Sequence, residues 1–159
     1  MSDATQKDLV VRFYVSAPGS TDESAREFVD AVRPAPEEEV IALVGDSGWR
    51  EQRVGAWMAL VHPSPAVVSA TLSGVLSARA WYGLPYLAVA AYELAGADAI
   101  PTFETFLAEV TPWEPQSTAF VAHLLALLRE QTSEADEATV ENFAVWDAAA
   151  TRILAAAAA

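Results

Sequence analysis

Proline and glycine divide this sequence into segments that each have the length and apolar spacing of one α-helix. In the first clear segment, apolar residues recur at positions i, i+3, i+4 and i+7, namely Ala25, Phe28, Val29 and Val32. This spacing is typical of one face of an amphipathic helix. Alanine, the strongest helix former, accounts for 33 of the 159 residues. The sequence therefore predicts an all-α protein.

The apolar pattern predicts a series of helices, and a repeat within it predicts how they are arranged. After two helices within 20–45, the remaining ones are expected at about 47–61, 64–79, 83–95, 98–110, 116–128 and 133–153. A shift of 34 residues aligns Leu60 with Leu94 and Leu128, and a period of this size is used by helical solenoids. We therefore expect a short right-handed stack of about three antiparallel helix pairs, similar to a HEAT-like α/α solenoid.

A chain of this length is expected to form one domain with one core, covering residues 1–159. Within it, 46–154 would contain the helix pairs, and the helices of 20–45, which do not follow the 34-residue register, would cap the stack. Residues 1–19 are expected to be extended or loosely ordered, although the apolar stretch 9–15 also fits a first helical turn. Residues 155–159 form an alanine tail.

Several polar residues stand where a helix is expected to begin. Ser20 and Glu23 have the spacing of a capping box, whereas Asp46 or Ser47, Ser64 and Asp98 fit single N-caps. At such a position, a short polar side chain can accept a hydrogen bond from a free backbone N–H of the first helical turn.

Charge and composition limit the classes of partner and location. There are 22 acidic residues against 9 lysines and arginines, so a net charge of -13 disfavours nucleic acid and anionic membranes and favours a basic protein partner, although solubility alone explains the same charge. Residues 1–8 lack the basic and apolar segments of a secretion signal, which favours a cytoplasmic location. Between Val54 and Tyr92 the only charged residue is Arg79, but prolines interrupt this stretch, which predicts buried helices and no membrane span.

The familiar motifs of catalysis and cofactor binding are missing from the sequence. There is no cysteine, no glycine-rich phosphate loop and no nucleophile elbow. The two histidines, His62 and His123, have no metal-ligand partner at helical spacing. We expect His62 to meet free carbonyl groups at a helix C-terminus, and His123 to be a hydrogen-bonded packing residue. The prediction is no catalytic residue, no metal and no cofactor.

The segment Trp49–Trp57, which begins with Trp-Arg and ends with Gly-Ala-Trp, is followed by an apolar helix and then by a tyrosine-containing helix at Tyr82–Tyr92. This order resembles an uncharacterised bacterial family of short, HEAT-like, all-helical proteins, over roughly 47–129. The resemblance implies a fold of helix pairs and brings no catalytic residue with it.

One group of side chains combines arginines, aromatic residues and an acid: Arg50, Arg53, Trp57, Arg79, Trp81, Tyr82, Tyr86 and Glu93. On one helix, Tyr82 and Tyr86 would share a face by the i, i+4 rule, and Glu93 lies seven residues beyond Tyr86. These residues are our candidate binding site, since tyrosine, tryptophan and arginine supply contact area and planar donors. In the alternative, the aromatics belong to the core, Arg79 pairs with Glu93 or caps a helix, and the other arginines lie at the solvent edge.

Two functional hypotheses follow. The first is a non-catalytic protein-binding module that docks a basic partner on the face of the helical stack, as an immunity-type protein would. The second is a small-molecule-binding protein or enzyme with an aromatic pocket between helices. Its walls would be Trp57, Trp81, Tyr82, Tyr86 and Trp113, with polar groups from Arg50, Arg79, Glu93 or His123. A homodimer through Trp113 and the C-terminal helix is compatible with either.

Overall fold

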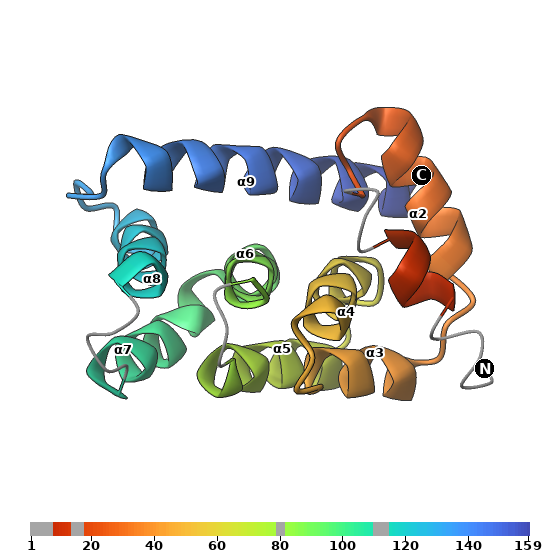
Figure 1. The fold of residues 1–159 in the computed structure, drawn as a ribbon, viewed down its shortest axis with the longest axis horizontal. Coiled ribbons are helices and arrows are strands. Elements are labelled where there is room, and N and C mark those ends of the chain that lie inside the picture. The colour runs from red at the N-terminus through yellow and green to blue at the C-terminus, as the bar shows by residue number, and fades with distance from the viewer. Residues whose placement is uncertain (1–7, 14–17, 79–81, 110–114) are drawn as a thin grey trace.

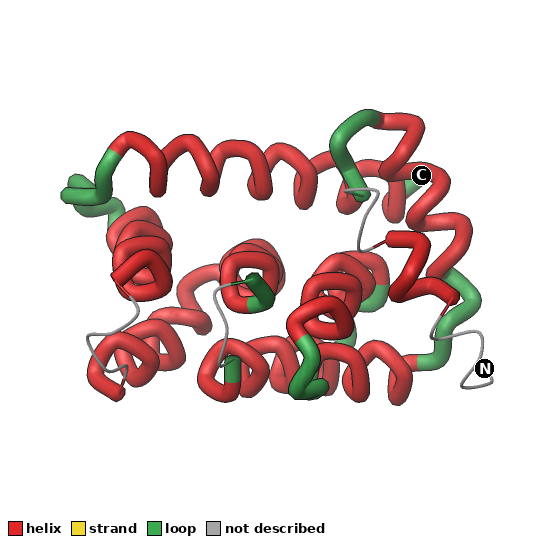
Figure 2. The backbone as a smooth tube through the Cα atoms, viewed as in Figure 1, coloured by secondary structure: helices red, strands yellow, loops and turns green. Residues whose placement is uncertain are grey.

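The computed structural model describes residues 8–13, 18–78, 82–109 and 115–159, and throughout these ranges the secondary structure is helical, without a strand (Figure 2). The prediction of an all-α protein is confirmed. Residues 8–13 are helical, and the helices that follow are α2 (Asp22–Val32), α3 (Glu37–Val44), α4 (Trp49–Val61), α5 (Pro65–Ser77), α6 (Leu84–Ala95), the short 3₁₀ helix η1 (Gly96–Ala99), α7 (Ile100–Glu109), α8 (Pro115–Leu128) and α9 (Glu137–Ala158).

The helices from α3 to α8 form two rows. Contacts join α3 to α4, α5 to α6 and α7 to α8, and within the rows α3 contacts α5, α5 contacts α7, α4 contacts α6, and α6 contacts α8 (Figure 1). Helix α9 belongs to neither row. It runs across α8, α6 and α4, and its C-terminal end lies against α2. One side of the α4, α6 and α8 row is therefore covered by a single long helix, an arrangement that the 34-residue register did not indicate.

The N-terminal segment is helical where it is described, so the expectation of an extended chain is wrong for residues 8–13. Leu9, Val10 and Phe13 are buried, and the Phe13 ring packs edge-on against Phe28 with 5.0 Å between ring centroids. Helical spacing places Leu9 and Phe13 on one face, so the segment buries its apolar side chains against α2. The helical alternative for this stretch is the correct one there.

The helix starts differ from the predictions in several places. The capping box of α2 is formed by Thr21 and Ser24, not by Ser20 and Glu23. Gly48 is the N-cap of α4, because the Asp46 carboxylate accepts the Gly48 N–H at 2.7 Å and forms a turn just before the helix.

The starts of α7 and α9 also differ from the predictions, whereas the predicted start of α5 is confirmed. Asp98 lies inside η1, so it does not cap α7. Helix α9 begins at Glu137 behind the N-cap Asp136, later than expected from Ser133. The prediction that Ser64 caps α5 is confirmed by its hydrogen bond from the Val67 N–H at 3.2 Å.

The weakly charged stretch forms the buried middle of the protein. On α4, the residues Val54, Ala56, Met58 and Leu60 are at most 1% exposed, and α6 contributes a buried run at 87–91. Within the described ranges, no helix combines the length and the apolar character needed to cross a membrane. The lack of charge in α4 after Val54 and in the 87–91 run of α6 thus reflects burial among neighbouring helices.

Candidate functional site

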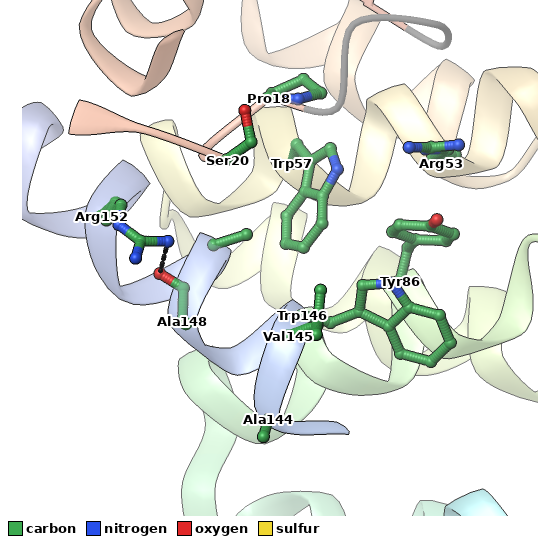
Figure 3. Close-up of a pocket in the computed structure, with 11 residues that line it drawn as sticks. Pro18, Ser20, Arg53, Trp57, Tyr86, Ala144, Val145, Trp146, Ala148 and Arg152 are labelled. Carbon is green, nitrogen blue, oxygen red and sulfur yellow. Dashed lines mark hydrogen bonds between the residues drawn. The ribbon is translucent and has the colours of Figure 1, made fainter. Parts of the chain in front are cut away.

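A pocket of about 440 Å³ opens between α4, α6, α9 and the segment 18–20 (Figure 3). Its wall is mostly aromatic and aliphatic, with two arginines at its edges. The residues that line it are Pro18, Ser20, Arg53, Trp57, Tyr86, Ala144, Val145, Trp146, Ala148, Ala149 and Arg152. The volume lies within the range of about 300–1,000 Å³ that is typical of small-molecule sites.

Three aromatic rings form the inner wall of the pocket. Trp57 packs edge-on against Tyr86 with a centroid distance of 5.4 Å, and Tyr86 lies 5.3 Å from the Trp146 ring. Each ring comes from a different helix, because Trp57 is on α4, Tyr86 on the first turn of α6, and Trp146 on α9. Helix α9 therefore completes a wall that α4 and α6 begin.

Arg53 and Trp57 bring two hydrogen-bond donors to the pocket. They are four residues apart on α4, so they share one face of the helix. The Arg53 guanidinium carbon lies 4.6 Å from the centroid of the Tyr86 ring. Figure 3 shows the guanidinium over Tyr86 and the Trp57 nitrogen on the side of the indole facing Arg53.

Among the described residues, these two donors have no acceptor. The Nε atom of Arg53 and the Nε1 atom of Trp57 are both buried and make no hydrogen bond. Unpaired buried donors are rare in folded proteins, and each costs about 1–3 kcal/mol when left without a partner. Both donors belong to residues that line the pocket.

Arg152, the second arginine of the pocket, differs from Arg53 because it has hydrogen-bond acceptors and an acidic partner within the protein. It donates to the carbonyl oxygens of Gly19 at 3.0 Å and Ala148 at 3.4 Å, and its Nε lies 3.6 Å from the Asp22 carboxylate. Gly19 has a φ of 79°, a conformation that favours glycine. Arg152 therefore ties the segment 18–20 to α9 and shapes one rim of the pocket.

The Tyr86 hydroxyl group remains protonated at neutral pH. Burial raises its pKa, while the positive charge of Arg53 and a hydrogen bond with the Trp146 side chain act in the opposite direction. The net direction is upward, so Tyr86 is neither a nucleophile nor a base near pH 7.

The structure brings together only some of the residues that the sequence singled out. Arg53, Trp57 and Tyr86 line the pocket, whereas Arg50 and Tyr82 lie outside it. Glu93 is on α6 and half-buried, also away from the pocket lining. Arg79, Trp81 and Trp113 lie outside the described residues.

Tyr82 and Arg50 belong to a group on the surface. Tyr82 is 65% exposed, and its ring lies 5.4 Å from that of Trp49, over which the Arg50 guanidinium sits at 4.4 Å. The expected shared face of Tyr82 and Tyr86 is wrong, because α6 begins only at Leu84 and Tyr82 precedes the helix. The i, i+4 rule applies only when both residues are helical.

Sequence reasoning did not assign the α9 residues Val145, Trp146 and Arg152 to a site. Trp146 lies in the helix expected at about 133–153, but nothing in the local sequence indicates which helices its apolar face would meet. The one signal in the sequence is the length of the predicted helix at 133–153, because a long helix can contact several neighbours; in the structure α9 has 22 residues.

The two histidines have the roles predicted for them. His62 Nε2 lies 3.0 Å from the carbonyl oxygen of Val32, the last residue of α2, so the helix end that it meets belongs to a neighbouring helix. His123 is buried, its Nδ1 lies 2.7 Å from the Ser133 hydroxyl, and burial lowers its pKa. Among the residues whose positions are described, no group of three or more acids or histidines is arranged to hold a metal ion.

Glu93 and Asp147 form a pair of carboxyl groups between α6 and α9. Burial, a hydrogen bond with Asp147 and repulsion from its charge raise the pKa of Glu93 from 4.5 to about 7. The folded protein thus holds this proton more tightly than the unfolded chain does. The stabilisation is fully present below about pH 4.5 and is lost as the pH rises through about 7.

We expect the free energy of unfolding to fall by about 1–2 kcal/mol between pH 4.5 and 7.5 on account of Glu93, which is less than the full shift would give because the side chain is half-exposed. Urea unfolding across this range measures the effect. Glu93→Gln should remove this part of the pH dependence, and Glu141→Gln, an exposed change on α9, should leave it intact. An unaltered pH dependence in Glu93→Gln would contradict the assignment.

Comparison with known proteins adds no family to this description. The matching of protein-family models, of curated proteins and of solved structures found nothing significantly similar to the chain. The resemblance to a bacterial family of HEAT-like proteins therefore receives no support from these comparisons. The function has to be argued from the pocket itself.

Proposed function

We propose that this chain is a non-catalytic binding protein that holds a small organic molecule in the pocket between α4, α6 and α9. The observation that carries the proposal is the pair of unpaired buried donors, Arg53 Nε and Trp57 Nε1, on the wall of a pocket of about 440 Å³. Binding sites typically combine an apolar wall with a few polar groups that orient the ligand. The pocket has this composition.

The polar groups of the pocket support binding and not catalysis. No carboxylate or imidazole belongs to the described residues that line it. An arginine cannot accept a proton, and Tyr86 keeps its own because burial raises its pKa. The pocket thus offers donors and flat aromatic walls, which suit an acceptor group on a flat apolar body.

A plug in the pocket tests the proposal. The probe is N-phenylnaphthylamine, a neutral dye whose fluorescence rises in an apolar environment. We expect the wild-type protein to bind it and Ala148→Trp to weaken binding about tenfold or more, because the new indole occupies the space between α9 and the pocket wall. The matched control is Ala138→Trp, an exposed change on the same helix outside the pocket.

Two results would overturn the proposal. In the first, the wild-type protein does not bind the dye. In the second, Ala148→Trp binds it as well as Ala138→Trp does, while thermal unfolding shows that both variants are folded. Either result would show that the pocket is not where apolar molecules are held.

Protein binding is the second candidate. It is supported by two exposed apolar residues on α9, Val140 at 42% and Val145 at 66% exposure, and by the charge of -13, which attracts basic surfaces. Val145 also lines the pocket. A pull-down at low and at high salt, with Val140→Asp, a change outside the pocket, beside the wild type, separates this function from small-molecule binding.

The finer features of the fold are also proposals. The two rows of helices, α3, α5 and α7 beside α4, α6 and α8, support a short HEAT-like stack with antiparallel pairs. A cytoplasmic location and a homodimer are expectations from the sequence. Mass measurement in solution at two concentrations decides the second of these.

A further inference from the structure

We propose that the ligand of this pocket is an organic monoanion, a carboxylate on a flat aromatic body, and that its carboxylate group binds to Arg53 and Trp57. The inference rests on the proposed function, because it names the class of molecule that the α4, α6 and α9 pocket would hold. It is drawn from the donors of α4 and from the charges around them.

Arg53 and Trp57 supply two donors from one face of α4. Arg53 and Trp57 are one helical turn apart on the same face of α4, and their Nε and Nε1 atoms are the buried donors without acceptors. A carboxylate has two oxygens, each with two lone pairs, so one group can accept from both side chains. Next to its Nε–H, a guanidinium has a second N–H that points in the same direction. These two parallel donors match the two oxygens of a carboxylate.

Arg53 has no acidic partner among the described residues. Within the described ranges, no carboxylate lies at ion-pair distance from it, although the chain has 22 acidic residues. Arg129 pairs with Glu104, and Arg152 pairs with Asp22 and two backbone carbonyls. A half-buried arginine gains most from an anionic partner, since the charge is poorly solvated there.

The contacts of Arg53 hold its guanidinium ready for an anion. Its contact with the Tyr86 ring, 4.6 Å from guanidinium carbon to ring centroid, orients the group and leaves the Nε edge without an acceptor. Arg152 is less suited to the same task because its Nη1 already donates to Gly19 and Ala148 and its Nε faces the Asp22 carboxylate. Of the two arginines that line the pocket, Arg53 is therefore the one that receives the carboxylate.

The charge of the protein limits the ligand to one negative charge. A net charge of -13 disfavours multiply charged anions such as nucleotides, and among the described residues of the pocket Arg53 is the one cation without an acidic partner. The rest of the wall consists of the rings of Trp57, Tyr86 and Trp146 with small aliphatic side chains. These surfaces suit a flat apolar molecule. Together with the single charge, they indicate an aromatic monocarboxylate as the ligand.

The test compares two probes that differ only in the anion, naphthoate and naphthalenemethanol, on the full chain by calorimetric titration. We expect the wild-type protein to bind naphthoate about tenfold or more tightly than naphthalenemethanol, because charge-assisted hydrogen bonds to a buried arginine contribute only to the first. Arg53→Gln should reduce this preference to below about threefold. Arg50→Gln, a change one turn earlier on α4 and outside the pocket, should keep it.

Trp57→Phe provides a second test, since it keeps an aromatic wall and removes the indole N–H. It should weaken naphthoate binding several-fold with little change for naphthalenemethanol. If the wild type binds both probes equally, or if Arg53→Gln keeps the preference, the carboxylate inference is overturned while the binding function stands. If the plug variant Ala148→Trp has no effect on either probe, the proposed function itself is overturned.

Discussion

Replacing Trp57 with alanine is expected to lower the free energy of unfolding by about 3–5 kcal/mol. Trp57 is only 2% exposed and packs against Tyr86 between α4, α6 and α9, so its removal leaves a cavity that three helices cannot close. The loss combines the transfer energy of a large buried ring with the cost of the cavity. Urea unfolding followed by circular dichroism measures it.

Tyr82→Ala is the matched control for Trp57→Ala. Both residues belong to the aromatic group that the sequence singled out, but Tyr82 is 65% exposed and contacts mainly the Trp49 ring. We expect a loss below about 1 kcal/mol. Equal losses for Trp57→Ala and Tyr82→Ala would contradict the assignment of one to the core and the other to the surface.

Gly55→Ala is expected to lower the free energy of unfolding by about 2–3 kcal/mol, although alanine is the better helix former by about 1 kcal/mol. A Cβ atom on Gly55 would lie 2.7 Å from the Val44 backbone nitrogen and 2.8 Å from the Leu43 carbonyl carbon. These are backbone atoms of α3, so α3 and α4 have to move apart. Thermal and urea unfolding would both report the loss.

Gly45→Ala is the control for Gly55→Ala. Gly45 follows α3 with a φ of -85°, and the nearest atom to an added Cβ would be the Ile41 carbonyl oxygen at 3.4 Å. The free energy of unfolding should stay the same or rise slightly, since alanine restricts the unfolded chain. A stable Gly55→Ala variant would mean that the helices are less closely packed than described.

The two results also bear on function, because α4 supplies both candidate donors. The close approach of α4 to α3 at Gly55 sets the position of the helix, and Arg53 and Trp57 lie on either side of that glycine. A shift of α4 would move both donors relative to Tyr86. We therefore expect Gly55→Ala to weaken ligand binding even under conditions in which the variant remains folded.

Local chemistry explains which parts of the fold could be predicted. The helices follow from apolar spacing and from proline and glycine at their ends, as Ser64 before α5 and Gly96 after α6 illustrate. The predicted N-cap is wrong where several short polar residues stand next to one another. Thr21, and not Ser20, is the N-cap of α2. Such choices depend on the path of the preceding loop, which neighbouring residues do not determine.

The candidate site was predictable only in part for a similar reason. Trp57 and Tyr86 could be singled out because aromatic residues stand out in a stretch with almost no charge, and Arg53 because it lies one helical turn before Trp57. Tyr82 was grouped with them by a helical spacing that ends at Leu84. Trp146 and Arg152 were not assigned to the site, because they are more than 50 residues away in the chain from Arg53, Trp57 and Tyr86.

The helical class, the approximate positions of the helices and the buried middle around α4 and α6 follow from the amino-acid sequence, because these depend on interactions within one helix and on the polarity of its faces. Only the tertiary structure decided that α9 crosses α4, α6 and α8, and so created the pocket beside Arg53 and Trp57. The physical reason is that hydrophobic burial has no direction: an apolar stripe requires a cover but does not specify which helices provide it.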